Sequence, residues 1–199
     1  MLALAFVLER FVHLKTSRVL TPELLDEAMG VSRQSVPDPG TVAQLEQHSA
    51  LGEILAAGLR ALNSNPQCSV EEMRAALEAA GRKVAHRLER YLPALATIAS
   101  AAPLMGLLGT VIGMIEIFGS QAPAGALAGS NPAQLAHGIS VALYNTAFGL
   151  IIAIPTLIFW RYFRARVDGY VMALELAAER FARHLEPLCS DAPRRGAAR

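Results

Sequence analysis

Polar side chains are scarce in the most apolar part of this sequence, and they limit the chemistry that is possible there. Between Leu92 and Trp160, Glu116 is the only Asp, Glu, Lys or Arg, although such residues make up 18% of the chain. The other polar groups of interest are His137, Ser140, Asn145, Thr110 and Thr146. A serine near a histidine suggests nucleophilic chemistry, whereas buried hydroxyls and amides can solvate a charge that is not their own.

The serine and the histidine could form a nucleophilic pair. Ser140 lies three residues after His137, which would make an intramembrane hydrolase conceivable. An i, i+3 pair on one helix is poorly placed for attack, however, and no loop that could form an oxyanion hole is evident. A hydrolase therefore stays as an alternative function, and substitution of Ser140 would abolish all activity of such an enzyme.

Two long apolar runs predict that the chain crosses a membrane. Residues 92–118 and 133–160 are separated by a segment rich in Gly, Ala, Pro and Ser at 119–132. A helix needs about 20 residues to cross the hydrocarbon core, and each run exceeds that length. With 199 residues, little room is left for a large catalytic domain. We predict an all-α, integral membrane helical bundle.

The basic residues predict how the spans are oriented. Ten Lys and Arg residues precede Leu92 and eight follow Trp160, whereas the segment 119–132 has no charge. Because basic flanks stay in the cytosol, both flanks should be cytosolic and the segment 119–132 should be a periplasmic loop.

The N-terminal part reads as a curtailed span followed by cytosolic helices. Residues 1–14 begin with eight apolar residues, about a third of a span, without the basic start of a signal peptide. We interpret them as the end of a truncated first transmembrane helix. Residues 15–91 should form a cytosolic helical region with helices at Thr41–Leu62 and Ser69–Tyr91, the second opened by a capping box.

The C-terminal residues 161–199 should form a cytosolic helix and tail. The apolar spacing predicts one stiff helix that continues the second span to about Leu185. We expect the tail from Ser190 onward to be disordered.

Small residues recur at helical spacing in both spans. Gly106, Gly109 and Gly113 share one stripe of the first span. In the second span, one stripe is shared by Gly138, Ala142, Asn145 and Gly149. Such stripes let helix backbones approach closely, so we predict that these glycines pack helices.

Several other classes of function have little support. The net charge of +1 argues against a nucleic-acid partner, and no zinc-like spacing or phosphate-binding glycine loop is present. The two cysteines, Cys68 and Cys189, lie outside the spans and are expected to be reduced. We expect no cofactor, no metal and no catalytic residue.

Taken together, the two spans resemble the TolQ/ExbB/MotA proton-channel family, and TolQ/ExbB in particular. The first matching string is PLMGLLGTVIGM, from Pro103 to Met114. The second comprises Gly138-Ile139, Ala142-Leu143, the string TAFGL from Thr146 and Ala153-Ile154-Pro155. The resemblance covers roughly residues 92–169, and the order of elements agrees over the whole chain.

The resemblance implies a stator of the bacterial inner membrane. Its subunits form a ring, five in the family, around the transmembrane helices of a smaller ExbD/TolR-like partner. The partner's membrane aspartate carries the proton, and the ring supplies pore-facing threonines that match Thr110 and Thr146. Work would pass to a TonB/TolA-type envelope protein. Each threonine could instead bond its own helix and be merely structural; together, with Asn145 beside them, they could solvate the partner's carboxylate.

Two features depart from the family pattern. ExbB and TolQ commonly carry a glutamate where this chain has Val141, so a relay role of that acid does not transfer. Glu116 is not an obvious substitute, because it lies toward the external loop, where a carboxylate stays hydrated. The curtailed first span is the other departure.

A passive membrane scaffold is a further alternative function. It differs from the stator only in whether protons flow.

Overall fold

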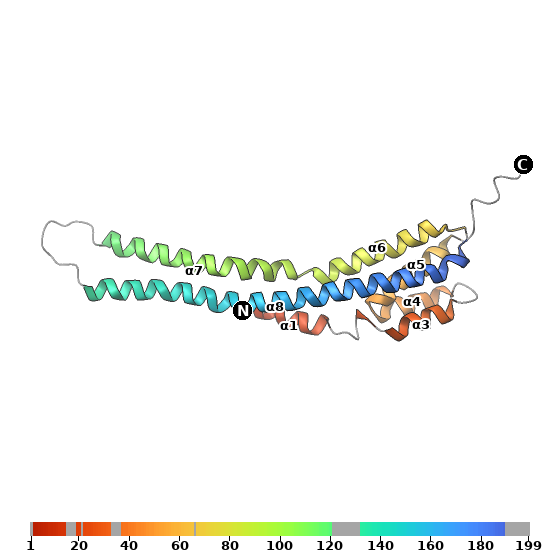
Figure 1. The fold of residues 1–199 in the computed structure, drawn as a ribbon, viewed down its shortest axis with the longest axis horizontal. Helices are drawn as coiled ribbons and strands as arrows, with labels where there is room; N and C mark the ends of the chain where they lie inside the picture. Colours follow the sequence, from red (N-terminus) through yellow and green to blue (C-terminus); the bar gives the residue numbers. More distant parts are fainter. Residues whose placement is uncertain are drawn as a thin grey trace, which may run out of the picture. The chain divides into compact units, whose positions relative to one another are not determined.

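The computed structural model describes residues 2–14, 19–20, 22–32, 37–65, 67–120 and 132–189. All regular elements within these ranges are helices, as Figure 1 shows. They are α1 (Leu2–His13), α3 (Pro22–Val31), α4 (Pro39–His48), α5 (Ala50–Ser64), α6 (Val70–Glu89), α7 (Leu92–Ser120), α8 (Pro132–Leu185) and the 3-10 helix η1 (Glu186–Leu188). The predicted all-α class is confirmed.

The chain forms two compact units. One consists of residues 1–7 and 91–163, and the other of residues 8–90 and 164–199. Since α8 contributes to both, its first half is described with α7 and its second half with α5 and α6.

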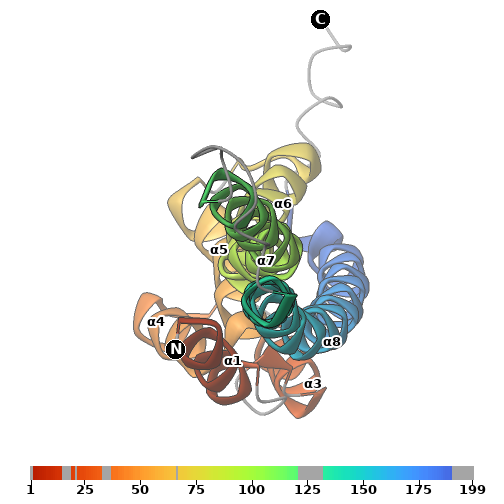
Figure 2. The same cartoon turned by 90° about the vertical axis from the view of Figure 1, so that its left-hand side faces the viewer.

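The first unit is built from α7 and the first half of α8, which lie side by side in Figures 1 and 2. Both helices contain a segment long and apolar enough to cross a membrane. Few residues of these segments are buried by the chain itself, and large side chains such as Leu104, Tyr144 and Ile151 are exposed. Exposed apolar surface of this kind is what a helix presents to lipid or to a partner span.

The second unit has a hydrophobic core centred on α5, which packs against α4 and α6. Its side chains Leu51, Ile54, Leu55 and Leu59 are almost fully buried. A Cβ added at Gly58 would lie 2.8 Å from Leu77 of α6 and 3.6 Å from Leu185 of α8. The absent side chain therefore allows α5 to sit close to both helices.

The helices of the second unit differ from expectation at one place. We predicted one helix at Thr41–Leu62, but α4 ends at His48 and α5 begins at Ala50. Ser49 between them is extended (φ −161°), and its hydroxyl accepts a hydrogen bond from the Gly52 amide at 3.1 Å. Because the Ser49 side chain caps the first turn of α5, the backbone at Ser49 is extended, and α4 therefore ends before it.

Other helix boundaries follow the sequence closely. The predicted capping box is confirmed: the Glu72 amide donates to the Ser69 hydroxyl, and the Ser69 amide donates to the Glu72 carboxylate. The predicted continuation of the second span is also confirmed, because α8 runs without a break to Leu185. The predicted tail from Ser190 and most of the predicted loop 119–132 lie outside the described residues.

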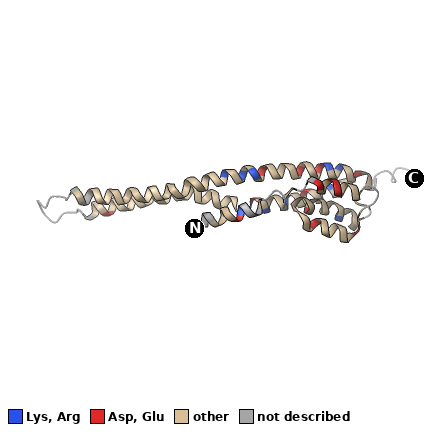
Figure 3. Cartoon of the chain, turned by 90° about the horizontal axis from the view of Figure 1, so that it is seen from below, with Lys and Arg blue, Asp and Glu red and all other residues tan. Residues whose placement is uncertain are grey.

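Charge is distributed unequally over the helices. Figure 3 shows Lys, Arg, Asp and Glu along α6 and the second half of α8, and almost none along α7 and the first half of α8. In the second unit, Glu53 pairs with Lys83 and Arg87, while Arg74 pairs with Glu179 and Glu186.

Candidate functional site

The predicted site residues other than Thr110 lie along the seam where α7 and α8 meet. A Cβ added at Gly106 would lie 3.3 Å from the Gly149 Cα, one at Gly113 would lie 3.3 Å from the Ala142 Cβ, and one at Gly138 would meet Ile117. Residue numbers rise along α7 as they fall along α8, so the two helices run antiparallel.

The seam is narrowest where the glycines meet backbone atoms. A Cβ at Gly149 would lie 2.6 Å from the Ala102 carbonyl oxygen, and one at Gly106 would lie 2.8 Å from the Asn145 carbonyl oxygen. Real Cβ atoms do not come so close to backbone, so any other residue would push the helices apart. At Gly109 the nearest atoms instead belong to the Asn145 side chain, which can rotate.

Thr146 and Asn145 lie in this narrow part of the seam. The Thr146 hydroxyl donates across it to the Gly106 carbonyl oxygen of α7, with a distance of 3.3 Å. The Asn145 amide nitrogen is 3.0 Å from where a Gly109 Cβ would stand. A hydroxyl that reaches a second helix differs from the usual arrangement, in which a threonine in a span bonds its own helix.

Thr110 lies one helical turn after Gly106, but its hydroxyl donates to its own helix, to the Leu107 carbonyl oxygen at 2.7 Å. No direct hydrogen bond joins it to Thr146 among the described residues. Its side chain helps to line a shallow apolar hollow on the surface of the first unit, formed by Thr110, Val111, Met114, Ile115, Phe118 and Gly119. Polar groups from both helices thus occur within one turn of each other, although they are not bonded together.

The alternative nucleophilic pair does not assemble in the structure. The Ser140 hydroxyl donates to the Ala136 carbonyl oxygen at 3.0 Å, and the His137 side chain is exposed. Glu116 is also exposed, near the end of α7, and Val141 is exposed on α8. None of these residues lies in the narrow part of the seam.

One buried polar residue of α8 was missed in the sequence. Thr156 is 4% exposed and continues the buried stripe of α8 that contains Ala142, Gly149 and Ala153. Its hydroxyl donates to the Ile152 carbonyl oxygen at 2.7 Å. Its position is a signal that could have found it: Ala153 follows Gly149 by four residues and Thr156 follows Ala153 by three, so the same stripe is extended by two turns.

The fold and the seam define a helical membrane protein whose paired spans carry hydroxyls and an amide but no charge at their contact. A profile of the MotA/TolQ/ExbB proton channel family matches residues 46–176, about two thirds of the chain. The chain therefore belongs to the MotA/TolQ/ExbB proton channel family.

Individual relatives agree with this assignment. A biopolymer transport protein of Synechocystis sp., ExbB-like 3, is 32% identical over 83% of this chain and 76% of its own length. The biopolymer transport protein ExbB of Pseudomonas putida is 33% identical over 72% of this chain, and the Tol-Pal system protein TolQ of Pseudomonas aeruginosa is 34% identical over 59%. The chain spans about half the length of the last two.

Proposed function

We propose that this chain is the ring-forming subunit of a proton-driven stator of the ExbB/TolQ type in the bacterial inner membrane. Its partner would be an ExbD/TolR-like subunit whose membrane aspartate carries the proton. The load would be a TonB/TolA-type envelope protein. The chain itself performs no enzymatic reaction in this proposal, because it shapes the path of a proton that the partner holds.

The observation that carries the proposal is the polar group in the seam. Thr146 lies between two spans of a proton-channel family member and bonds the Gly106 carbonyl oxygen at 3.3 Å, a long and therefore weak bond. A hydroxyl held this loosely can turn toward a carboxylate that arrives from a partner. Thr110 and Asn145, one turn away or adjacent, would add a second hydroxyl and an amide.

The mechanism follows from the cost of charge in a membrane. An ionised aspartate in hydrocarbon is expensive unless polar groups solvate it, so the partner's aspartate would favour positions beside these residues. Protonation removes the charge and with it this preference. Uneven proton occupancy around a ring would then turn or shift the partner's helices relative to the ring.

The test is proton flux in vesicles that hold both subunits, with load-dependent growth as a second readout. Thr146→Val keeps the shape of the side chain and removes the hydroxyl, so we expect flux to fall about tenfold, as for the loss of one hydrogen bond to a charged group. Thr110→Val should have a smaller effect. The matched control is Thr97→Val, since the Thr97 hydroxyl donates to the Pro93 carbonyl oxygen of its own helix.

Membrane levels and partner binding must stay unchanged for the result to count. Full flux in a Thr110→Val, Thr146→Val double variant would leave the family assignment intact and remove these residues as the working site. Absence of flux with every partner tested would favour the passive scaffold instead. A small protein with one N-terminal span and a membrane aspartate, encoded beside this chain, is the expected partner.

A further inference from the structure

The second half of α8 carries an exposed apolar stripe in the part of the chain that is otherwise rich in charge. Met172 is 65% exposed and Leu176 is 59% exposed. Ala165 and Gly169 precede them on the same face, so that the four residues follow one another at spacings of four, three and four. Uncharged residues that alternate at these spacings are the pattern of a seam along which a second helix packs.

The same repeat is present in the first half of α8, where the helix is apolar enough to cross a membrane. Steps of three and four residues back from Ala165 reach a further series of exposed residues, namely Tyr162, Ile158, Pro155, Ile151, Phe148, Tyr144 and Val141. In the proposed ring, the exposed surface of this half meets lipid or other subunits. One register that continues from the apolar half into the charged half indicates that a neighbouring subunit follows α8 along both.

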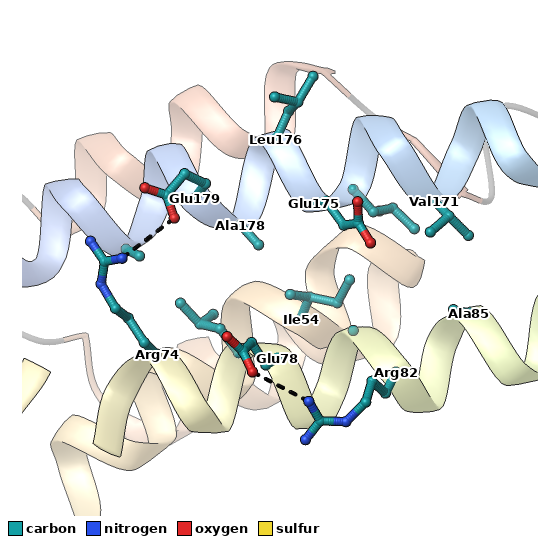
Figure 4. A pocket seen from close by; sticks show the side chains of 14 residues that line it. Ile54, Arg74, Glu78, Arg82, Ala85, Val171, Glu175, Leu176, Ala178 and Glu179 are labelled. Carbon is teal, nitrogen blue, oxygen red and sulfur yellow. Dashed lines mark hydrogen bonds and ion pairs between the residues drawn. The ribbon is translucent and has the colours of Figure 1, made fainter. Parts of the chain in front are cut away.

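The second unit also has a groove between α6 and the second half of α8, with a volume of about 580 Å³ (Figure 4). The groove exists because the residues along its walls are small: Gly81 and Ala85 of α6 line it with Ala178 and Ala182 of α8. A Cβ added at Gly81 would meet no atom within 4 Å. The described chain therefore leaves room here for side chains from another molecule.

The stripe and the groove lie on different sides of α8. Figure 4 shows Glu175 directed toward α6 and Leu176 directed away from it. Met172 lies on the same side of the helix as Leu176, because residues four apart share a face. One copy thus presents a ridge on one side of α8 and a groove on another. Contacts between two unlike surfaces of this kind close into rings, whereas contact between two like surfaces gives a pair.

Two charges favour a second copy as the occupant of the groove. Glu175 on the groove side and Arg180 on the stripe side are exposed, and neither has an ion pair within the part of the chain that the structure describes. By contrast, Glu78 and Glu179 of the groove rim are paired with Arg82 and Arg74. The groove of one copy therefore offers a negative charge, and the ridge of another copy offers a positive one.

The heights of these charges along α8 agree with such a contact. Copies that are related by a rotation axis along the helices lie at the same height. Arg180 follows Glu175 by five residues, which corresponds to about 7.5 Å along the helix. A long side chain on a helix leans toward the N-terminus of that helix, so the Arg180 guanidinium of one copy can reach the level of Glu175 in the next.

We propose that the stripe centred on Met172 in one copy packs into the α6/α8 groove of the neighbouring copy, where Arg180 pairs with Glu175. Met172 enters beside Ala85, which lies opposite Val171 across the groove in Figure 4. A flexible thioether side chain suits a space between glycine and alanine walls, because it can adapt to an irregular gap. This inference rests on the ring of the proposed function and adds the surfaces of the second unit that join its subunits.

Disulfide crosslinking in native membranes tests the contact. Met172→Cys and Ala85→Cys are placed in separate, differently tagged chains with Cys68→Ala and Cys189→Ala, and the two chains are coexpressed. Oxidation with copper phenanthroline should join them, whereas either chain alone should give no crosslink. One chain that carries both substitutions should give a ladder of species up to the ring size. The matched control pairs Met172→Cys with Ala79→Cys, an exposed position of α6 outside the groove, and should give no crosslink.

Charge reversal tests the ion pair. Glu175→Arg or Arg180→Glu alone should slow the crosslink between positions 172 and 85 about threefold, the scale of an exposed ion pair. Both reversals together should restore the rate, because the pair is then complete with its signs exchanged. Glu71→Arg, at an exposed acidic position of α6 outside the groove, is the control and should leave the rate unchanged.

The outcomes separate this inference from the proposed function. Crosslinks between two Met172→Cys chains, without Ala85→Cys, would overturn it in favour of two stripes in contact. Rings of normal size by native mass spectrometry, with proton flux but no crosslink between positions 172 and 85, would overturn the inference and leave the stator function standing. Chains that form no ring at all would contradict both.

Discussion

At the scale of single residues, Glu53 links helix packing to pH. Its carboxylate on α5 receives Lys83 at 3.1 Å and Arg87 at 2.6 Å, both from α6. Burial alone would raise the pKa of Glu53, but the hydrogen bonds and charges of Arg87 and Lys83 outweigh it and hold the pKa below its ordinary value of about 4.5. The ionised form is therefore favoured by the folded state.

The resulting stability has a definite pH window. Above about pH 4.5 Glu53 is ionised in the folded and unfolded states and its contribution is complete; it is lost as the pH falls through the lower pKa of the folded state. We expect Glu53→Gln to lower the stability of the second unit by about 1 kcal/mol at neutral pH, since water still screens part of the interaction. The variant's melting temperature should also fall less on acidification.

The comparison is made by thermal unfolding in detergent between neutral pH and pH values below 4.5. Glu78→Gln is the matched control, because Glu78 and its partner Arg82 are both about 70% exposed, and a pair of that kind contributes little. Parallel acid curves for wild type and Glu53→Gln would show that Glu53 does not couple folding to pH.

The sequence located the polar residues of the candidate site but not their contacts. Thr110 and Thr146 stand out because hydroxyls are conspicuous in an apolar run. That Thr146 bonds across to Gly106 while Thr110 bonds its own helix depends on the register of α7 against α8. Register is set by packing between residues about 40 positions apart, and no local pattern contains it.

At the scale of elements, the glycines of the seam should not be equivalent. Gly149→Ala would place a Cβ 2.6 Å from the Ala102 carbonyl oxygen, and moving backbone apart costs about 1–3 kcal/mol. Gly109→Ala meets only the Asn145 side chain and should cost less. Gly169→Ala, with no atom within 4 Å, should stabilise α8 by up to about 1 kcal/mol.

Larger substitutions test whether assembly of the ring depends on the contact between α7 and α8. Gly109→Leu or Gly149→Leu should leave membrane insertion intact, because the spans stay apolar, and should abolish the ring by separating α7 from α8. Oligomer size is measured by native mass spectrometry and insertion by the level of protein in washed membranes. Gly169→Leu is the control, and a ring of unchanged size in Gly149→Leu would show that assembly does not depend on this seam.

The helices were largely predictable because their signals are local. The capping box at Ser69 and the uninterrupted apolar spacing into the last helix placed α6 and α8 within a few residues. The break at Ser49 was not predicted, since the apolar spacing continues through it. The groove between α6 and α8 was also beyond the sequence, because it arises from small residues on helices nearly 100 positions apart.

At the scale of the whole molecule, hydropathy determines that the helices enter a membrane, and charge predicts their orientation. Burial of apolar helices in a bilayer requires only length and composition, so the membrane class followed from the sequence alone. Membership of the MotA/TolQ/ExbB proton channel family rests instead on similarity to that family over residues 46–176. The orientation of the spans in the membrane is a separate matter. The distribution of basic residues predicts it, whereas the structures of α7 and α8 are compatible with either orientation.

The topology prediction can be tested with thiols in living cells. Basic residues on both flanks and none in residues 119–132 predict that this segment is periplasmic and the flanks are cytosolic. In a cysteine-free background, Ala126→Cys should react with a membrane-impermeant maleimide in cells whose outer membrane alone is permeable. Ala79→Cys and Ala192→Cys should react only after the inner membrane is opened.

Each variant labelled in detergent gives its maximal reactivity, so that local burial is not mistaken for sidedness. Labelling of Ala79→Cys in intact spheroplasts, with Ala126→Cys protected, would reverse the orientation, and an ExbD/TolR-like partner acting on the periplasmic side could then no longer be proposed.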